Sequence, residues 1–231
     1  MAGASKVREK CAKGWLQRGG ARRRECPGFL HRAWQTGKPR GVVCSPQGHP
    51  LENPSSWGEP PTPERLRELA DWGVSLWREN RERYALCAKE LPADLKLSVL
   101  PFFPAELMEK VRYVQLKGEY VSLPQDEIRK FADMPQSEHQ HGFMFEDVLV
   151  MNQPLTRRRL FHSLVHAVQI EKLGLANYML MYLQALVTTR AYINVPFEIQ
   201  AFNLDARFVA APYDPFSVTE EVELWIRKSL Y

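Results

Sequence analysis

The chain contains the segment Leu160-Phe-His-Ser-Leu-Val-His-Ala-Val-Gln-Ile-Glu-Lys-Leu-Gly174, and the interpretation of the remaining sequence depends on it. Its apolar residues recur at helical spacing, and Gly174 is a typical residue to end a helix. His162 and His166 are four residues apart, which on a helix is a rotation of about 40° and a rise of about 6 Å. The segment therefore predicts one helix from which both imidazoles leave the same face.

Two neutral imidazoles in this arrangement can hold one zinc ion, as they do in the His-Glu-x-x-His motif of zinc peptidases. In that motif the glutamate is the general base, and here Ser163 occupies its position. A serine hydroxyl has no basicity near neutral pH, and loss of a general base costs a factor of about 10² to 10⁴ in rate. We therefore name no catalytic residue and expect peptide hydrolysis to be weak or absent.

Zinc needs a third protein ligand. Glu198 fits by position, because it lies in the first turn of a helix that begins at Pro196, downstream of both histidines. In the gluzincin class of zinc peptidases the third ligand is a glutamate from such a later helix.

The segments that carry this site resemble a family of small, mostly uncharacterised bacterial zincin-like proteins of gluzincin type. The family core reads Leu-Phe-His-Glu-Leu-Val-His-Val-Val-Gln, followed by Ile-Pro-Leu-Glu with an alanine three residues after the glutamate. The matching segments here are Phe161–Gln169, Leu173-Gly174, Pro196–Phe202 and Asp205–Phe208. The resemblance covers roughly residues 143–231, departs from the family at Ser163, and implies one zinc ion held by His162, His166 and Glu198.

Three other residues near these segments each have two interpretations. Gln169, one turn after His166, either orients a zinc ligand or lies on the helix surface. Asp205, two turns after Glu198, either supports a histidine or pairs with an arginine. Tyr192 either donates to an oxyanion or packs beside Pro196. His139 and His141 are expected to be surface residues.

Length and composition indicate one globular domain with an extension. The chain has 231 residues, of which 45% are hydrophobic, so it can bury a sizeable core. No apolar run is long enough to span a membrane, and the first residues lack the apolar segment of a secretory signal. The expected compartment is therefore the cytoplasm, where the four cysteines stay reduced.

Residues 1–62 are expected to form a basic, disordered extension ahead of a zincin-like domain at residues 63–231. They hold 11 Lys/Arg and 4 Asp/Glu, so their net charge is +7, whereas the rest of the chain carries −3. Nucleic acid is not an expected partner, except through weak attraction to this extension. Its pairs Cys26/His31 and Cys44/His49 match no common zinc-finger spacing, so no second metal site is expected.

The domain is predicted to be α+β and predominantly helical, with a short strand before the metal helix. Residues 63–89 are predicted to form a helix capped by Thr62, and Thr156 is the expected cap of the metal helix. The other expected elements are a short strand or extended segment at 97–103, a helix at 104–116, a helical turn at 126–131, a strand at 143–151 that contains Glu146, a helix at 175–187, a helix that begins at Pro196 and runs to residue 208, and a last helix within 215–227.

Three functions remain open. The first is a degenerate gluzincin, a zinc-binding protein that acts by binding. The second is an active zinc hydrolase with a non-standard base, such as Glu146, and the third is a metal-free helical protein whose histidines only pack. In the first case a Zn²⁺ ion with one carboxylate ligand keeps a net charge of about +1, which favours a peptide or an anionic ligand in the open position.

Overall fold

The computed structural model describes residues 58–231. Contacts divide the chain between Ser56 and Trp57. Most of the expected extension, including the two Cys/His pairs, lies outside the described residues. The predicted boundary at residue 62 therefore stays a prediction.

The fold is α+β and predominantly helical, as expected, with one small mixed sheet. The sheet contains β1 (Lys89–Glu90), β2 (Arg112–Gln115), β3 (Gly142–Phe145) and β4 (Val148–Met151), in the order β1-β2-β4-β3. β2 and β4 are parallel, whereas β1–β2 and β3–β4 are antiparallel. β4 is a central strand that is buried along its whole length.

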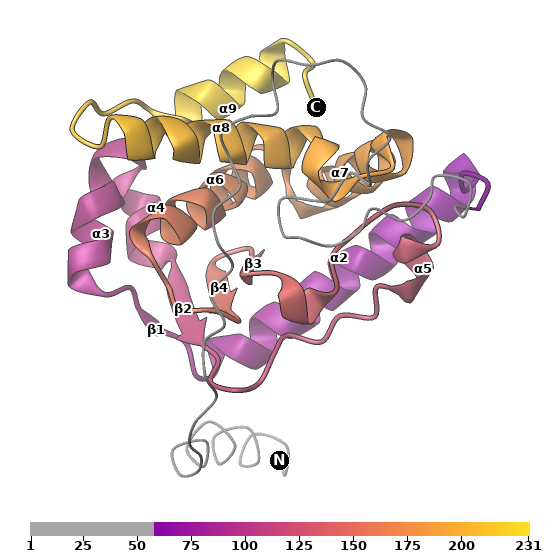
Figure 1. Ribbon diagram of the computed structural model, residues 1–231, viewed down its shortest axis with the longest axis horizontal. Helices are drawn as coiled ribbons and strands as arrows, with labels where there is room; N and C mark the ends of the chain where they lie inside the picture. The colour runs from indigo at the N-terminus through magenta and orange to yellow at the C-terminus, as the bar shows by residue number, and fades with distance from the viewer. Residues whose placement is uncertain (1–57) are drawn as a thin grey trace, which may run out of the picture. The chain divides into compact units, whose positions relative to one another are not determined.

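The two faces of the sheet pack against different helices. Side chains alternate along a strand, so Val148 and Val150 share one face and Leu149 and Met151 share the other. The first pair belongs to a cluster that includes residues of α2 (Pro63–Ala85), and the second pair belongs to the core around α6 (Arg157–Leu173). Figure 1 shows α6 on one side of the strands and α2 on the other.

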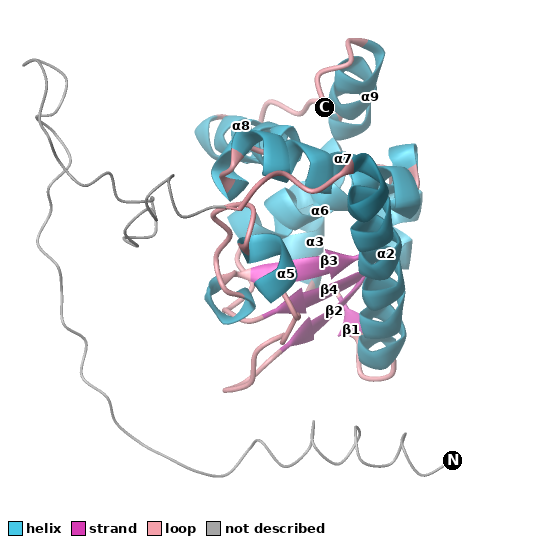
Figure 2. Cartoon of the chain, turned by 90° about the vertical axis from the view of Figure 1, so that its right-hand side faces the viewer, coloured by secondary structure: helices cyan, strands magenta, loops and turns pink. Residues whose placement is uncertain are grey.

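The remaining helices extend these two layers. α3 (Ala93–Val99) and α4 (Ala105–Lys110) contribute to the core beneath α6, while α7 (Leu175–Thr189) packs along α2. α8 (Pro196–Ala210) lies across α6, and α9 (Val218–Arg227) also contacts α6, as Figures 1 and 2 show. The short helical segments are α5 (Asp126–Arg129) and the 3₁₀ turns Leu100–Phe102, Ser137–His139 and Tyr192–Asn194.

Local signals at the helix ends are confirmed. The Thr62 and Thr156 hydroxyls accept hydrogen bonds from the third residue of α2 and α6, so each satisfies a free N–H group. Gly174 ends α6 with a φ of 75°, a conformation that glycine adopts without steric cost. Pro196 is the first residue of α8.

Three predicted elements are wrong. Residues 143–151 form a hairpin rather than one strand, because the chain reverses at Glu146-Asp147, where Glu146 has a φ of 56°. Residues 97–103 end α3 and continue as a 3₁₀ turn, since Val99, Phe102 and Phe103 pack into the core beneath α6. The helix predicted at 104–116 ends at Lys110, and residues 112–115 pair with β4 instead.

None of the helices within residues 58–231 combines the length and the apolar character that a membrane span requires.

Candidate metal centre

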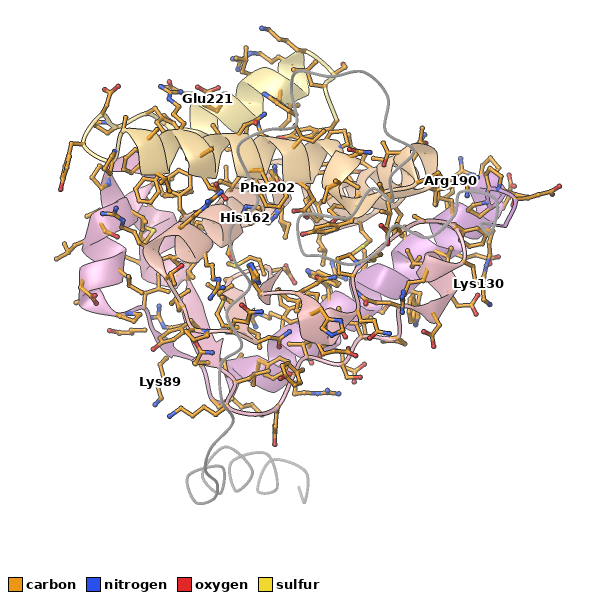
Figure 3. All side chains as sticks on the ribbon, in the orientation of Figure 1. Lys89, Lys130, His162, Arg190, Phe202 and Glu221 are labelled. Carbon is orange, nitrogen blue, oxygen red and sulfur yellow. The ribbon has the colours of Figure 1, made fainter. Side chains whose placement is uncertain are left out.

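The core fixes the orientation of α6. Phe161 and Leu164 are fully buried on the side of α6 that faces the core. The Phe161 ring stacks on Phe208 of α8 with ring centroids 4.4 Å apart, so this contact ties the two helices together. His162 and His166 leave a different side of α6 and are mostly buried beside α8, where the partly exposed Phe202 ring lies 4.7 Å from the His162 ring (Figure 3).

The three predicted ligands come together between α6 and α8. The Nε2 atoms of His162 and His166 are 3.2 Å apart, and each lies 3.5 Å from Oε2 of Glu198. Glu198 is 3% exposed in the first turn of α8. Among the described residues these three side chains are the one group of histidine, cysteine and carboxylate residues close enough to share a metal ion.

The second nitrogen of each histidine has its own partner. His162 Nδ1 lies 3.1 Å from Oδ2 of Asp205, and His166 Nδ1 lies 2.8 Å from Oε1 of Gln169. A carboxylate and an amide oxygen only accept hydrogen bonds, so both Nδ1 atoms are donors. In the neutral imidazoles both Nε2 atoms therefore carry lone pairs, and these lone pairs face each other and the Glu198 carboxylate. A metal cation between the three atoms would satisfy this arrangement, and so would a proton on His162 Nε2, because the pKa of His162 is raised to about 9.

The two contacts with Glu198 fit zinc ligation better than they fit hydrogen bonds. Ligand atoms about 2.0–2.1 Å from a tetrahedral zinc ion lie roughly 3.3–3.4 Å from one another. The observed separations of 3.2, 3.5 and 3.5 Å bracket this value. A good N–H···O hydrogen bond is about 2.7–3.2 Å long, so the contacts with Glu198 are too long for strong hydrogen bonds. Two imidazoles and one carboxylate are also a usual donor set for zinc.

Two tyrosines hold Glu198. Tyr182 donates to Oε1 at 2.8 Å, and Tyr192 donates to Oε2 at 2.8 Å. Burial and the charge of Glu198 raise the pKa of both phenols well above their ordinary value, so both stay protonated as donors. Burial also raises the pKa of Glu198, but the charges and hydrogen bonds of the two histidines outweigh it and lower that pKa far below its ordinary value.

A second carboxylate supports His162. Burial lowers the pKa of His162, but hydrogen bonds and charge interactions with Asp205 and Glu198 outweigh it and raise the pKa to about 9. Arg158 in the first turn of α6 pairs with Asp205 Oδ1 at 2.8 Å. This contact explains one arginine of the run 157–159, and it offsets the charge of Asp205.

The other predicted site residues have distinct places. Ser163 is half-buried on α6, about 60° round the helix from His166. Glu146 lies in the β3–β4 turn, at the opposite end of β3 from His141. His141 is exposed, as expected, and burial of its ring followed by the charges of Arg159 and His162 lowers its pKa. Tyr192 directs its hydroxyl proton to Glu198 rather than to an oxyanion site.

Several contacts of the centre were not predicted from the sequence. Neither Tyr182 nor Arg158 was among the residues expected at the site. The hydroxyl of Tyr178 also approaches His166 Nδ1 at 3.4 Å. Tyr178 and Tyr182 are four residues apart on α7, so the repeat of tyrosines on one helical face was the available signal.

No family model, no curated protein and no solved structure matches this chain. The likeness to gluzincins therefore depends on the motif residues around His162, His166 and Glu198. The metal centre is inferred from the geometry of these side chains.

Proposed function

We propose that the chain is a zinc-binding domain of gluzincin type that acts by binding and has weak or no peptidase activity. The observation that carries this proposal is the convergence of two histidine Nε2 atoms and one Glu198 oxygen, with both Nδ1 atoms held by acceptors. His162, His166 and Glu198 would hold the metal ion. A zinc ion in such a site supplies Lewis acidity toward a ligand oxygen.

The missing general base supports a binding role. Ser163 cannot accept a proton near neutral pH, whereas the glutamate of the hydrolytic motif can. The two carboxylates that contact the histidines in the described part of the chain are already engaged, Glu198 by two tyrosines and Asp205 by Arg158. Glu146 is separated from the His141 end of β3 by the length of the strand, so the structure offers no support for it as a substitute base.

The charge of the centre favours an anionic ligand. A divalent ion with one carboxylate ligand keeps a net charge of about +1. The negative charge of Asp205 would cancel this positive charge. Arg158 forms an ion pair with Asp205 and neutralises it, so the net positive charge of the centre is kept. A carboxylate or another small anion, free or at the end of a peptide, is the class of ligand that this centre would attract.

Elemental analysis of protein purified without added metal tests the proposal. We expect about one zinc ion per chain, and we expect His166→Ala to lose most of it. His141→Ala is the matched control, because this exposed histidine lies near His162 but outside the ligand triangle, and it should keep the metal. Wild-type protein with well under half an equivalent of metal, or an unchanged content in His166→Ala, would show that the histidines only pack.

A further inference from the structure

Two buried glutamines connect His166 to a residue far along the chain. Gln169, the partner of His166, is 0% exposed, and Gln200 of α8 is 1% exposed. Gln169 Nε2 donates to Gln200 Oε1 at 2.9 Å. The hydroxyl of Tyr231 donates to the same Gln200 oxygen. Tyr231 is thus linked to His166 through two amides.

The direction of every bond in this connection is fixed. Gln169 Nε2 also donates to the carbonyl oxygen of Phe197 at 3.1 Å, and Gln200 Nε2 donates to the carbonyl oxygen of Glu221 at 3.1 Å. Carbonyl oxygens only accept, so each amide has a single orientation. Gln169 Oε1 must then accept from His166 Nδ1, and this leaves the His166 Nε2 lone pair directed at the ligand triangle.

The Tyr231 ring also reaches the other side of the centre. It stacks on Phe197 with ring centroids 4.3 Å apart and an interplanar angle of 6°. Phe197 packs in turn against Tyr178 at 4.8 Å and Tyr182 at 5.9 Å. Tyr182 holds Glu198, so Tyr231 is connected to the supports of two ligands, through Phe197 on one side and through the two glutamines on the other.

We propose that Tyr231 is a positioning residue of the metal centre, whose hydroxyl holds Gln200 and Gln169 so that His166 presents Nε2 to the metal. This inference rests on the proposed zinc site and adds a residue that touches none of its ligands. Loss of a direct partner of a zinc-binding histidine lowers metal affinity about 10- to 100-fold. Tyr231 acts through two intervening amides, so we expect Tyr231→Phe to lower zinc affinity roughly three- to tenfold.

Zinc affinity measured by competition with a chelating dye, together with the visible spectrum of the cobalt-substituted protein, tests this inference. Tyr231→Phe removes the hydroxyl and keeps the ring that stacks on Phe197. Tyr213→Phe is the matched control, since Tyr213 is 93% exposed. Trp77→Phe controls for lost stability, because it removes a 2.9 Å hydrogen bond to the Met144 carbonyl on β3. The affinity and the cobalt spectrum should change in Tyr231→Phe and in neither control.

A double-mutant cycle separates positioning from general stability. If Tyr231 acts through Gln200, then Tyr231→Phe should have no further effect on zinc affinity in a Gln200→Met background. Equal effects in both backgrounds, or an unchanged affinity in Tyr231→Phe alone, would overturn the inference while the zinc site stands. If Gln200→Met does not fold, the comparison of Tyr231→Phe with Trp77→Phe decides whether Tyr231 positions the metal centre. Wild-type protein that binds no zinc would instead remove the proposed function itself.

Discussion

Ser163 is the residue at which this site departs from a hydrolytic one. The side chains that the proposed three-ligand zinc site would need are present: two imidazoles whose Nδ1 atoms donate to fixed acceptors, a buried carboxylate and hydrogen-bond partners for each. Supporting groups of this kind are costly to bury unless they are paired, and here each is paired. On the proposed function, serine at position 163 would impair proton transfer and leave metal binding intact.

Replacing Ser163 with glutamate should restore the missing base. Glutamate is a better helix former than serine, so α6 should tolerate the change. We expect cleavage of an unstructured protein such as casein to rise about 10²-fold or more over the parent, to disappear with a chelator and to return with zinc. Ser163→Gln is the matched control, because it has the same shape without basicity and should stay inactive.

Two results would contradict this prediction in different ways. A parent protein that cleaves casein as well as Ser163→Glu would show that another base exists. A Ser163→Glu protein that binds zinc but stays inactive would show that groups which orient the substrate are also missing.

The three site residues could be predicted because they depend on local spacing. His162 and His166 share a helical turn, and Pro196 marks the start of the helix that carries Glu198. Gln169 and Asp205 could be named as candidate supports from their spacing. The contacts of Arg158 and Tyr231 could not be predicted, because they depend on tertiary packing, and for Tyr182 the local signal was its repeat with Tyr178 on one face of α7. Their roles follow only once α7 and α8 lie beside α6.

At the scale of elements, the β3–β4 hairpin shows why the local sequence did not predict the strands correctly. Its turn is Glu146-Asp147, which lacks the glycine or asparagine that usually marks a two-residue turn. A long-range contact stabilises it instead, because Arg81 of α2 donates to both Asp147 oxygens at 2.8 and 2.9 Å. The prediction of a helix through residue 116 was wrong for a similar reason, because residues 112–115 form a strand that pairs with β4.

The contribution of the Arg81–Asp147 pair should depend on pH. Hydrogen bonds from Arg81 lower the pKa of Asp147 and outweigh partial burial, which raises it. A carboxyl group whose pKa is lowered by folding stabilises the fold above its unfolded pKa of about 3.9, and this stabilisation is lost as pH falls through the folded pKa. Asp147→Asn should therefore lower the unfolding free energy at pH 7 by roughly 0.5–1 kcal/mol, a value reduced for solvent screening.

Urea unfolding at pH 7 and near pH 3 checks this expectation. The difference between wild type and Asp147→Asn should shrink at the lower pH. Asp71→Asn on the exposed side of α2 is the control and should change stability little at either pH. A difference that is the same at both pH values would mean that the carboxylate charge does not stabilise the hairpin.

At the scale of the whole molecule, the sheet, the helices on both its faces and the candidate metal centre all lie within residues 58–231. From the shift in composition and charge near residue 62 the sequence predicted a domain at residues 63–231, and this boundary stays a prediction. It did not predict that Gly58 belongs with the domain. Gly58 N–H donates to the Lys130 carbonyl at 3.0 Å, and Arg190 donates to the Gly58 carbonyl at 3.2 Å.

Deleting residues 1–57 should leave the domain folded. We expect its melting temperature to stay within a few degrees of the full chain and its metal content to be unchanged, because the residues that build the core and the centre are retained. Deletion of residues 1–62 provides the contrast, since it removes both Gly58 bonds and the Thr62 cap of α2. Loss of an N-cap costs about 1 kcal/mol, which for a chain of this size is about 2–4 °C.

Thermal unfolding and elemental analysis of the two truncated proteins separate the alternatives. The shorter deletion should match the full chain, and the longer one should melt a few degrees lower with the same metal content, because the cap lies on α2 and the ligands lie on α6 and α8. Loss of cooperative unfolding after removal of residues 1–57 would show that these residues stabilise the domain, and the boundary would then be wrong. Loss of zinc with unfolding unchanged would show that they contribute to the metal centre.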